Sequence, residues 1–508
     1  MNLIKSTGTF SFFTLISRIS GYLRDILIAI FLGAGPIADA FFVAFRIPNT
    51  FRRLFSEGTF NAAFVPSYSS QLAIKKKAKY FANTIFNILL ISLLFLVFLV
   101  EIFMPGFVFI IAPGFEKNID KLDLTITLTR ITFPFLLFVS LSSFFSAILN
   151  SHNKFAAASA SPIILNIFLI ITLSLSNYLN DQLVFYLSLA VSLAGLFQLL
   201  FLIYFVKKYF IPSLSFKFNI NDKVKLFFKK LLPSIFSSGV TQINILIGTI
   251  IASFQASAVS YLYYADRIYQ INLAVAGIAI GTVILPSLSK YIQSKDKKKI
   301  TFIQNKSLEL SLFLSLPATA ALLIASEQIT SSLFGYGSFD ELSVKNSSLA
   351  LFYFALGLPA FSLIKVFSSF LFARHNTIVP FYFSIISVLI NVAISLYYFK
   401  DIGFIIIPIA TSISSWTNAF ILFLYLNYKK YFFLKFRLIA SILKITLVTA
   451  ISSYIFYYLI GTFSNNLTYD SKYKILFIIL AVIITISSYI LISIVTKAFK
   501  LSDIKLKY

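Results

Sequence analysis

Long apolar runs recur along the whole chain and constrain its fold more than any other feature. A transmembrane helix needs about 20 predominantly apolar residues to cross a hydrocarbon core roughly 30 Å thick. Fourteen segments meet this requirement, at 7–33, 38–68, 83–111, 124–150, 155–177, 182–206, 226–254, 258–290, 304–334, 347–373, 377–399, 402–427, 438–461 and 474–496. The sequence therefore predicts an all-α polytopic membrane protein, in which Pro48 breaks or kinks the second span.

The composition narrows the classes of function. Hydrophobic residues make up 58% of the 508 residues and charged residues only 12%, and the chain has no cysteine and two histidines. Disulfides, thiol catalysis and thiolate metal sites are therefore excluded, and no catalytic residue, metal site or cofactor is expected. The chain contains no Gly-Lys-Ser/Thr nucleotide-binding loop, which argues against an ATP-driven pump. The sequence predicts a transporter and not an enzyme.

The basic residues are distributed unevenly between alternate connections. One set of connections, together with the two termini, carries 28 lysines and arginines. The opposite set carries six lysines: Lys117, Lys121, Lys345, Lys400, Lys472 and Lys474. The positive-inside rule then predicts that both termini are cytoplasmic. The net charge of +25 is explained by this topology, with the lysines meeting anionic lipid head groups, and no nucleic-acid partner is expected.

An internal repeat predicts the arrangement of the spans. The segment 63–69 recurs as 283–289, with a Pro-Ser pair in each. Two further short matches, of 44–47 with 265–268 and of 151–153 with 374–376, have nearly the same offset of about 220. Each repeat holds an even number of spans, so the two lobes are expected to be parallel, with a substrate site between them. The expected parts are an N-terminal six-helix lobe at 1–222, a C-terminal six-helix lobe at 223–432, and two additional helices with a cytoplasmic tail at 433–508.

Charged side chains are concentrated in the first two spans. Five of the nine arginines lie there, close to three acidic residues: Arg18, Arg24, Arg46, Arg52, Arg53, Asp25, Asp39 and Glu57. Charged side chains inside a membrane almost always face a bundle interior or a wet cavity. Because these arginines outnumber the carboxylates, an anion-binding cavity is the main interpretation. Internal ion pairing or snorkelling to the interface is the alternative.

Three further positions stand out. Gly21 on the first span has two open interpretations, close helix packing and room for a substrate or hinge. Lys365, well inside the tenth span, is expected to face the cavity. In the internal repeat, Asp266 and Arg267 of the second lobe align with Phe45 and Arg46 of the first lobe.

These residues resemble a known family. The patterns Arg18-x-x-Gly21-x-x-Arg24-Asp25 and Ala38-Asp39-Ala-Phe-Phe-Val-Ala-Phe-Arg46-Ile-Pro48-Asn49, with the following Arg52-Arg53 and Glu57-Gly58, resemble the MurJ (MviN) family. Members of that family are lipid II flippases of bacterial peptidoglycan synthesis, in a superfamily with multidrug and polysaccharide exporters. The resemblance covers essentially the whole chain.

The resemblance implies roles for particular residues. Arg18, Arg24, Arg52 and Arg267 would be the cavity cations that bind the lipid II pyrophosphate. Further functionally sensitive or gating positions would be Gly21, Asp25, Asp39, Arg46, Arg53, Glu57, Ser260, Asp266 and Lys365. Asp39 and Ser260, at corresponding positions of the two repeats, are expected to meet at the outer end of the cavity.

The function expected from the resemblance is flipping of lipid II, the undecaprenyl-pyrophosphate-linked muropeptide, across the bacterial inner membrane by alternating access. Membrane potential or an ion gradient would drive it, and the cell-wall synthesis machinery is an expected partner. Two alternatives remain open: export of another lipid-linked oligosaccharide of the O-antigen or capsule type, and a non-transporting membrane scaffold in wall assembly.

Overall fold

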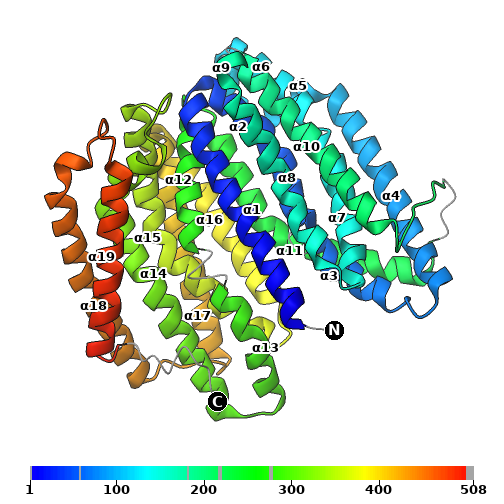
Figure 1. The fold of residues 1–508 in the computed structure, drawn as a ribbon. Coiled ribbons are helices and arrows are strands. Elements are labelled where there is room, and N and C mark those ends of the chain that lie inside the picture. The colour runs from blue at the N-terminus through cyan, green and yellow to red at the C-terminus, as the bar shows by residue number, and fades with distance from the viewer. Residues whose placement is uncertain (1–2, 57–58, 180–181, 216–219, 274–278, 499–508) are drawn as a thin grey trace. The chain divides into compact units, whose positions relative to one another are not determined.

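The computed structural model describes residues 3–56, 59–179, 182–215, 220–273 and 279–498. These residues form helices joined by short connections (Figure 1). The helices are α1 (Leu3–Leu32), α2 (Pro36–Ser56), α3 (Thr59–Ser69), α4 (Lys75–Ile102), α5 (Met104–Ile111), η1 (Pro113–Lys117), α6 (Ile119–Thr132), α7 (Phe135–Ser151), α8 (Phe155–Ser174), α9 (Ser176–Leu179), α10 (Leu183–Val206), α11 (Asp222–Ala252), α12 (Ala258–Leu273), α13 (Ala279–Gln293), α14 (Lys297–Phe334), α15 (Glu341–Phe372), α16 (Ile378–Ile402), η4 (Gly403–Ile405), α17 (Ile406–Tyr428), α18 (Phe436–Thr462), η5 (Ser464–Asn466) and α19 (Lys474–Val495).

Asparagine and aspartate side chains fix where several helices begin. Asn118 accepts a hydrogen bond from the backbone of Lys121 at the start of α6, and Asn221 does the same for Val224 in α11. Asp296 and Asp340 cap α14 and α15 in the same way. Such caps satisfy backbone N–H groups that have no partner in the first turn. The four cap residues therefore mark where these helices begin.

Proline and glycine have different effects on the predicted spans. The second span is expected to break or kink at Pro48; α2 continues through this residue to Ser56, so the helix does not break there, and a kink stays a prediction. Between the eleventh and twelfth predicted spans, α16 ends at Ile402 and is followed by Gly403, whose φ of 73° lies in the left-handed region that favours glycine. Gly403 therefore makes the turn that separates α16 from α17.

The described residues contain nine helical segments that are long and apolar enough to cross a membrane, which confirms a polytopic helical membrane protein. One of them, Ile378–Tyr428, contains both the eleventh and the twelfth predicted spans. The predicted number of fourteen spans stays a prediction.

The chain forms two compact units, Met1–Ser260 and Tyr261–Tyr508. The expected boundary at 222/223 and the separate C-terminal part at 433–508 stay predictions. In the first unit, five buried phenylalanines from α3, α4, α7 and α11 pack with ring centroids 5.3 to 6.3 Å apart; they are Phe60, Phe64, Phe81, Phe144 and Phe227. Edge-to-face and offset pairs of this kind stabilise beyond their buried area.

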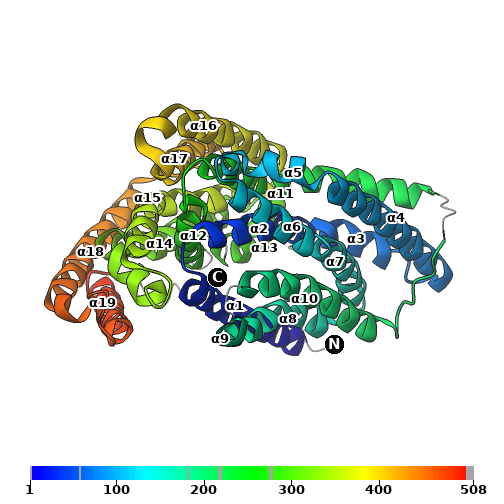
Figure 2. The ribbon, with the colours of Figure 1, turned by 90° about the horizontal axis from the view of Figure 1, so that it is seen from above.

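The core of the second unit joins α13, α14, α15 and α17 through buried side chains that include Leu288, Phe370 and Leu426. The last two helices, α18 and α19, pack on one another and on α14 (Figures 1 and 2). Phe456 of α18 and Ala481 of α19 are buried against Ala325 of α14. At Ala325 the backbone leaves helical geometry, with φ −130° and ψ 34°, so α14 is kinked where this pair packs.

Candidate functional site: buried charges in the first unit

Arg24 and Asp25 form a buried ion pair on α1. The Nε and Nη2 atoms of Arg24 lie 3.0 and 2.7 Å from Oδ1 of Asp25, and the two residues are 7% and 3% exposed. The sequence interpretation placed Arg24 among cations without enough acidic partners. For Arg24 this is wrong, because the adjacent carboxylate compensates its charge.

The guanidinium of Arg24 has a second partner on another helix. Helix α1 packs along α8 (Figures 1 and 2), and Nη1 of Arg24 donates to Oδ1 of Asn166 on α8 at 2.9 Å. The amide nitrogen of Asn166 donates to the Ser17 carbonyl and to the Ser20 hydroxyl, each at 3.0 Å. Sequence reasoning missed Asn166. Its signal was a single amide within the apolar run of α8, since polar side chains often bond across membrane helices.

Gly21 of α1 faces Asn166 of α8. A Cβ atom built on Gly21 would lie 3.5 Å from Nδ2 of Asn166, which is ordinary van der Waals contact. A side chain larger than a methyl group would displace the amide. Of the two interpretations of Gly21, this geometry favours close helix packing.

Arg18 differs from Arg24 because it is exposed. Within the part of the chain that the structure describes, Arg18 has no ion pair. It therefore presents an uncompensated positive charge on α1, seven residues before Asp25.

Asp39 of α2 lies in a second buried cluster. Its Oδ2 is 2.6 Å from Nζ of Lys121, and its Oδ1 accepts hydrogen bonds from the backbone N–H and the hydroxyl of Ser260, at 2.8 and 2.5 Å. Asp39 and Ser260 are fully buried and Lys121 is 8% exposed, with its ammonium 3.8 Å from the Phe115 ring centre. The structure brings Asp39 and Ser260 together, as the sequence predicted; their gating role stays a prediction.

The cluster around Asp39 has a clear electrostatic basis. Ser260 is the third residue of α12, so its N–H is one of those left free at the start of a helix. A carboxylate is stabilised there by the helix dipole as well as by the hydrogen bonds. Lys121 supplies the balancing charge, although the sequence predicts it in a connection between two spans.

The other predicted residues of the first unit are only partly described. Nε of Arg52 donates to Oδ1 of Asn49 at 3.0 Å on the same helix, and Arg46 is half-buried. The side chain of Arg53 and all of Glu57 lie outside the described residues.

In the second unit, Arg267 lies beside a tyrosine. Its Nη2 donates to the Tyr263 hydroxyl at 2.9 Å, and its guanidinium lies 4.6 Å from the centre of that ring. Asp266 accepts a hydrogen bond from Gln270, one turn further along α12. Lys365 of α15 has an exposed side chain, and α13 approaches its backbone so closely that a Cβ on Gly281 would lie 3.4 Å from the Lys365 carbonyl oxygen.

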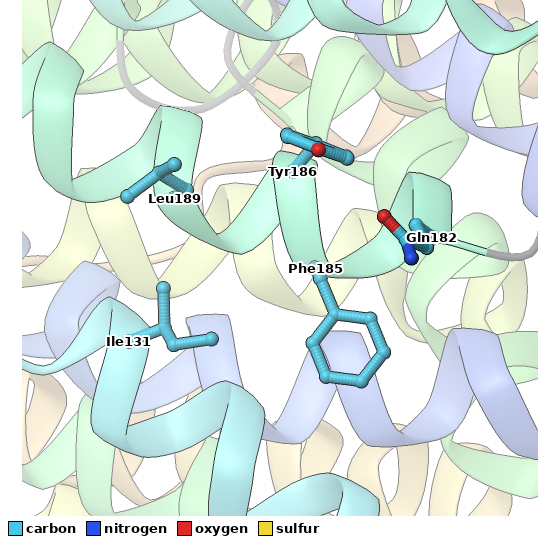
Figure 3. A pocket seen from close by; sticks show the side chains of 5 residues that line it. All are labelled: Ile131, Gln182, Phe185, Tyr186 and Leu189. Atoms are coloured by element: carbon cyan, nitrogen blue, oxygen red, sulfur yellow. The ribbon is translucent and has the colours of Figure 1, made fainter. Parts of the chain in front are cut away.

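A shallow hollow in the first unit lies away from these charges. It is lined by Ile131 of α6 and by Gln182, Phe185, Tyr186 and Leu189 at the start of α10 (Figure 3). Four of the five lining side chains are aliphatic or aromatic, and none is charged. This hollow therefore lacks the groups that bind an anion.

The fold and the buried charges define a polytopic α-helical membrane protein with ion pairs inside its helix bundle. A family model described as "Lipid II flippase MurJ" matches residues 28–494. The chain belongs to the MurJ family.

Individual relatives agree with this assignment. The chain is 39% identical over 432 residues to a "Probable lipid II flippase MurJ" of Rickettsia prowazekii (strain Madrid E), with 84% of each chain covered. It is 33% identical over 434 residues to the "Lipid II flippase MurJ" of Burkholderia cenocepacia, again with 84% of each chain covered.

Solved structures give the same result. A structure described as "Lipid II flippase MurJ, inward closed conformation" is similar with a TM-score of 0.81 and 27% identity, over 95% of this chain and 97% of that one. An inward-facing multidrug resistance MATE family transporter of the MOP superfamily is similar with a TM-score of 0.66 and 15% identity, over 81% of this chain and 94% of that one. The second similarity concerns the fold alone.

Proposed function

We propose that this protein flips lipid II, the undecaprenyl-pyrophosphate-linked precursor of peptidoglycan, from the cytoplasmic to the periplasmic leaflet of the bacterial inner membrane. The observation that carries the proposal is Arg24, a guanidinium held by Asp25 and Asn166 inside a membrane protein of the MurJ family. Arginine in a fixed orientation binds phosphate oxygens with two parallel hydrogen bonds. The pyrophosphate of lipid II is such a ligand.

The proposed ligand set is Arg18, Arg24 and Arg52 in the first unit, with Arg267 as the contribution of the second unit. Arg18 supplies charge that pairs with no carboxylate among the described residues, and Arg24 supplies a preorganised fork. The transport mechanism is alternating access and no covalent chemistry is involved.

The topology proposed with this function places both termini in the cytoplasm. Two of the six lysines assigned to the opposite side, Lys121 and Lys474, are buried in internal contacts. Their ammonium groups are therefore bound by internal partners on that side.

Depletion of the protein in its own cells tests the function. We expect lipid II to accumulate in the cytoplasmic leaflet, where an externally added glycan-modifying reagent does not reach it, and wild-type protein to restore access. Accumulation of a different lipid-linked saccharide would identify an exporter of O-antigen or capsule type. Unchanged leaflet distribution of every such lipid would contradict a flippase and favour a scaffold.

A further inference from the structure

Asn166 is a buried amide inside the apolar stretch of α8. Asn166 is 5% exposed. Among the described hydrogen bonds of Arg24, only the one to Asn166 reaches a side chain outside α1. The amide also contacts two groups of α1, the Ser17 carbonyl and the Ser20 hydroxyl. A buried polar side chain with partners on one neighbouring helix fixes the position of those partners.

The contacts determine which way the amide faces. The Ser20 hydroxyl donates to the Ser17 carbonyl at 3.2 Å, so its oxygen is left to accept from Asn166. Both acceptors on α1 therefore require the NH2 group of the amide. A flipped amide would direct this NH2 group at the Arg24 guanidinium, which has only donors. The oxygen of Asn166 must face Arg24.

This arrangement leaves part of the guanidinium for a ligand. Arginine has five N–H donors. Asp25 accepts one hydrogen bond from Nε and one from Nη2, and Asn166 accepts one from Nη1. One N–H on each terminal nitrogen remains. Asn166 thus restrains the guanidinium without placing a second negative charge beside it, as a carboxylate would.

We infer that Asn166 is a positioning residue for anion binding: it holds Arg24 so that its two remaining N–H groups bind the pyrophosphate oxygens of the transported lipid. This inference rests on the proposed function. A side chain held in its binding orientation before the ligand arrives loses less freedom on binding, so affinity is higher.

A double-mutant cycle on the full chain in detergent tests the inference, with undecaprenyl pyrophosphate as the probe. Hydrogen bonds to charged groups contribute enough that Asn166→Ala should weaken binding by roughly tenfold or more. Arg24→Ala should weaken it at least as much. Because Asn166 acts through Arg24, the double variant should bind no more weakly than Arg24→Ala alone.

Asn391 is a matched control. It is a buried amide on α16, 6% exposed, with hydrogen bonds to Thr411 and Ser395. Asn391→Ala removes a comparable buried network in the second unit, so it should lower the thermal midpoint without changing the affinity for the probe. Asn166→Ala should change the affinity.

Asn166→Asp provides a second variant that keeps the acceptor for Arg24 but loses the two hydrogen bonds that the amide donates to Ser17 and Ser20, so its thermal midpoint is measured beside its affinity. It should bind the probe more weakly than wild type, since the added negative charge opposes the anion. Wild-type affinity in Asn166→Asp, or additive losses in the double variant, would overturn the positioning role.

The outcomes separate this inference from the proposed function. Loss of binding in Arg24→Ala with none in Asn166→Ala rejects the inference and leaves the proposed site in place. Unchanged binding in Arg24→Ala contradicts both.

Discussion

Two lysines are buried although they lie in or beside the predicted connections between spans. Lys121 lies in a predicted connection and Lys474 is the first residue of the last predicted span, yet they are only 8% and 1% exposed. Lys474 donates to the carbonyls of Gly335 and Tyr469, each at 2.6 Å, and so joins the end of α14 to the connection before α19. A buried ammonium is tolerated only when such partners surround it.

Removal of the ammonium of Lys121 should strongly destabilise the first unit. Lys121→Met leaves the Asp39 carboxylate buried beside Ser260 without its counter-charge, and the loss of one partner of a buried pair costs about 3–5 kcal/mol. The thermal midpoint in detergent should fall accordingly. Lys117→Met, at an exposed lysine four residues earlier, should change stability by no more than about 0.5 kcal/mol. Equal midpoints for the two variants would contradict the structural role of Lys121.

His152 should give the protein a pH-dependent stability below about pH 6.5, the ordinary pKa of histidine. The ring follows α7, stacks on Tyr209 with centroids 4.5 Å apart, and burial lowers its pKa. Since the unfolded chain then binds the proton more readily than the folded one, stability falls as the pH drops through the unfolded pKa towards the lower folded value. His152→Phe keeps the stack and removes the titration.

The measurement is the thermal midpoint of both proteins from pH 7.5 to 5. The difference between wild type and His152→Phe isolates this one group. The midpoint of wild type should fall more steeply on acidification; parallel curves would show that the folded protein does not disfavour the charged ring.

At the level of elements, the connections between helices pack as closely as the helices themselves. Gly114 in η1 donates its backbone N–H to the Ser253 hydroxyl at 3.0 Å. A Cβ on Gly114 would lie 2.4 Å from backbone atoms of Ser253 and Phe254, closer than real Cβ contacts. The backbone of η1 therefore lies directly against the residues that follow α11.

Gly114→Ala should move η1 away from Ser253 and cost about 1–3 kcal/mol or more, as overpacking does. Gly106→Ala in α5 is the control, because a Cβ there meets nothing within 4 Å. Thermal midpoints of the two variants should differ by several degrees, with Gly106→Ala close to wild type. A wild-type midpoint in Gly114→Ala would mean that this contact is not maintained.

Helical class, membrane character and the clustering of charge on α1 and α2 were predictable from the sequence, because apolar length and intramembrane charge are local signals. The partners of those charges were not predictable. Asn166 lies 142 residues from Arg24 and Lys121 lies 82 from Asp39, so only packing brings them together. The meeting of Asp39 and Ser260, 221 residues apart, was anticipated because the internal repeat supplied long-range information.

The same comparison explains the one incorrect inference about charge. A comparison of the number of cations with the number of carboxylates treats all these charged groups as lying in one environment. The structure separates them into an exposed Arg18, an Arg24–Asp25 pair held by Asn166, and an Asp39–Lys121 pair. The excess positive charge therefore belongs to particular residues and not to the whole bundle.

The whole molecule has a MurJ-family membrane fold and carries, in the first unit, an arginine held in place by Asp25 and Asn166. The fold alone does not define the substrate, since transporters of other substrates have a similar fold. The arginine gives the fold its proposed preference for a lipid pyrophosphate.

Flipping of lipid II by purified protein in liposomes tests this account most directly. Three proteins are compared at equal reconstitution: wild type, Arg24→Ala, and Arg130→Ala, which alters an exposed arginine at the end of α6. Wild type and Arg130→Ala should expose labelled lipid II to the opposite leaflet at similar rates. Arg24→Ala should be slower by roughly tenfold or more, the loss expected when a hydrogen bond to a charged group is removed. Wild-type flipping by Arg24→Ala, or no flipping by the wild-type protein, would contradict the account.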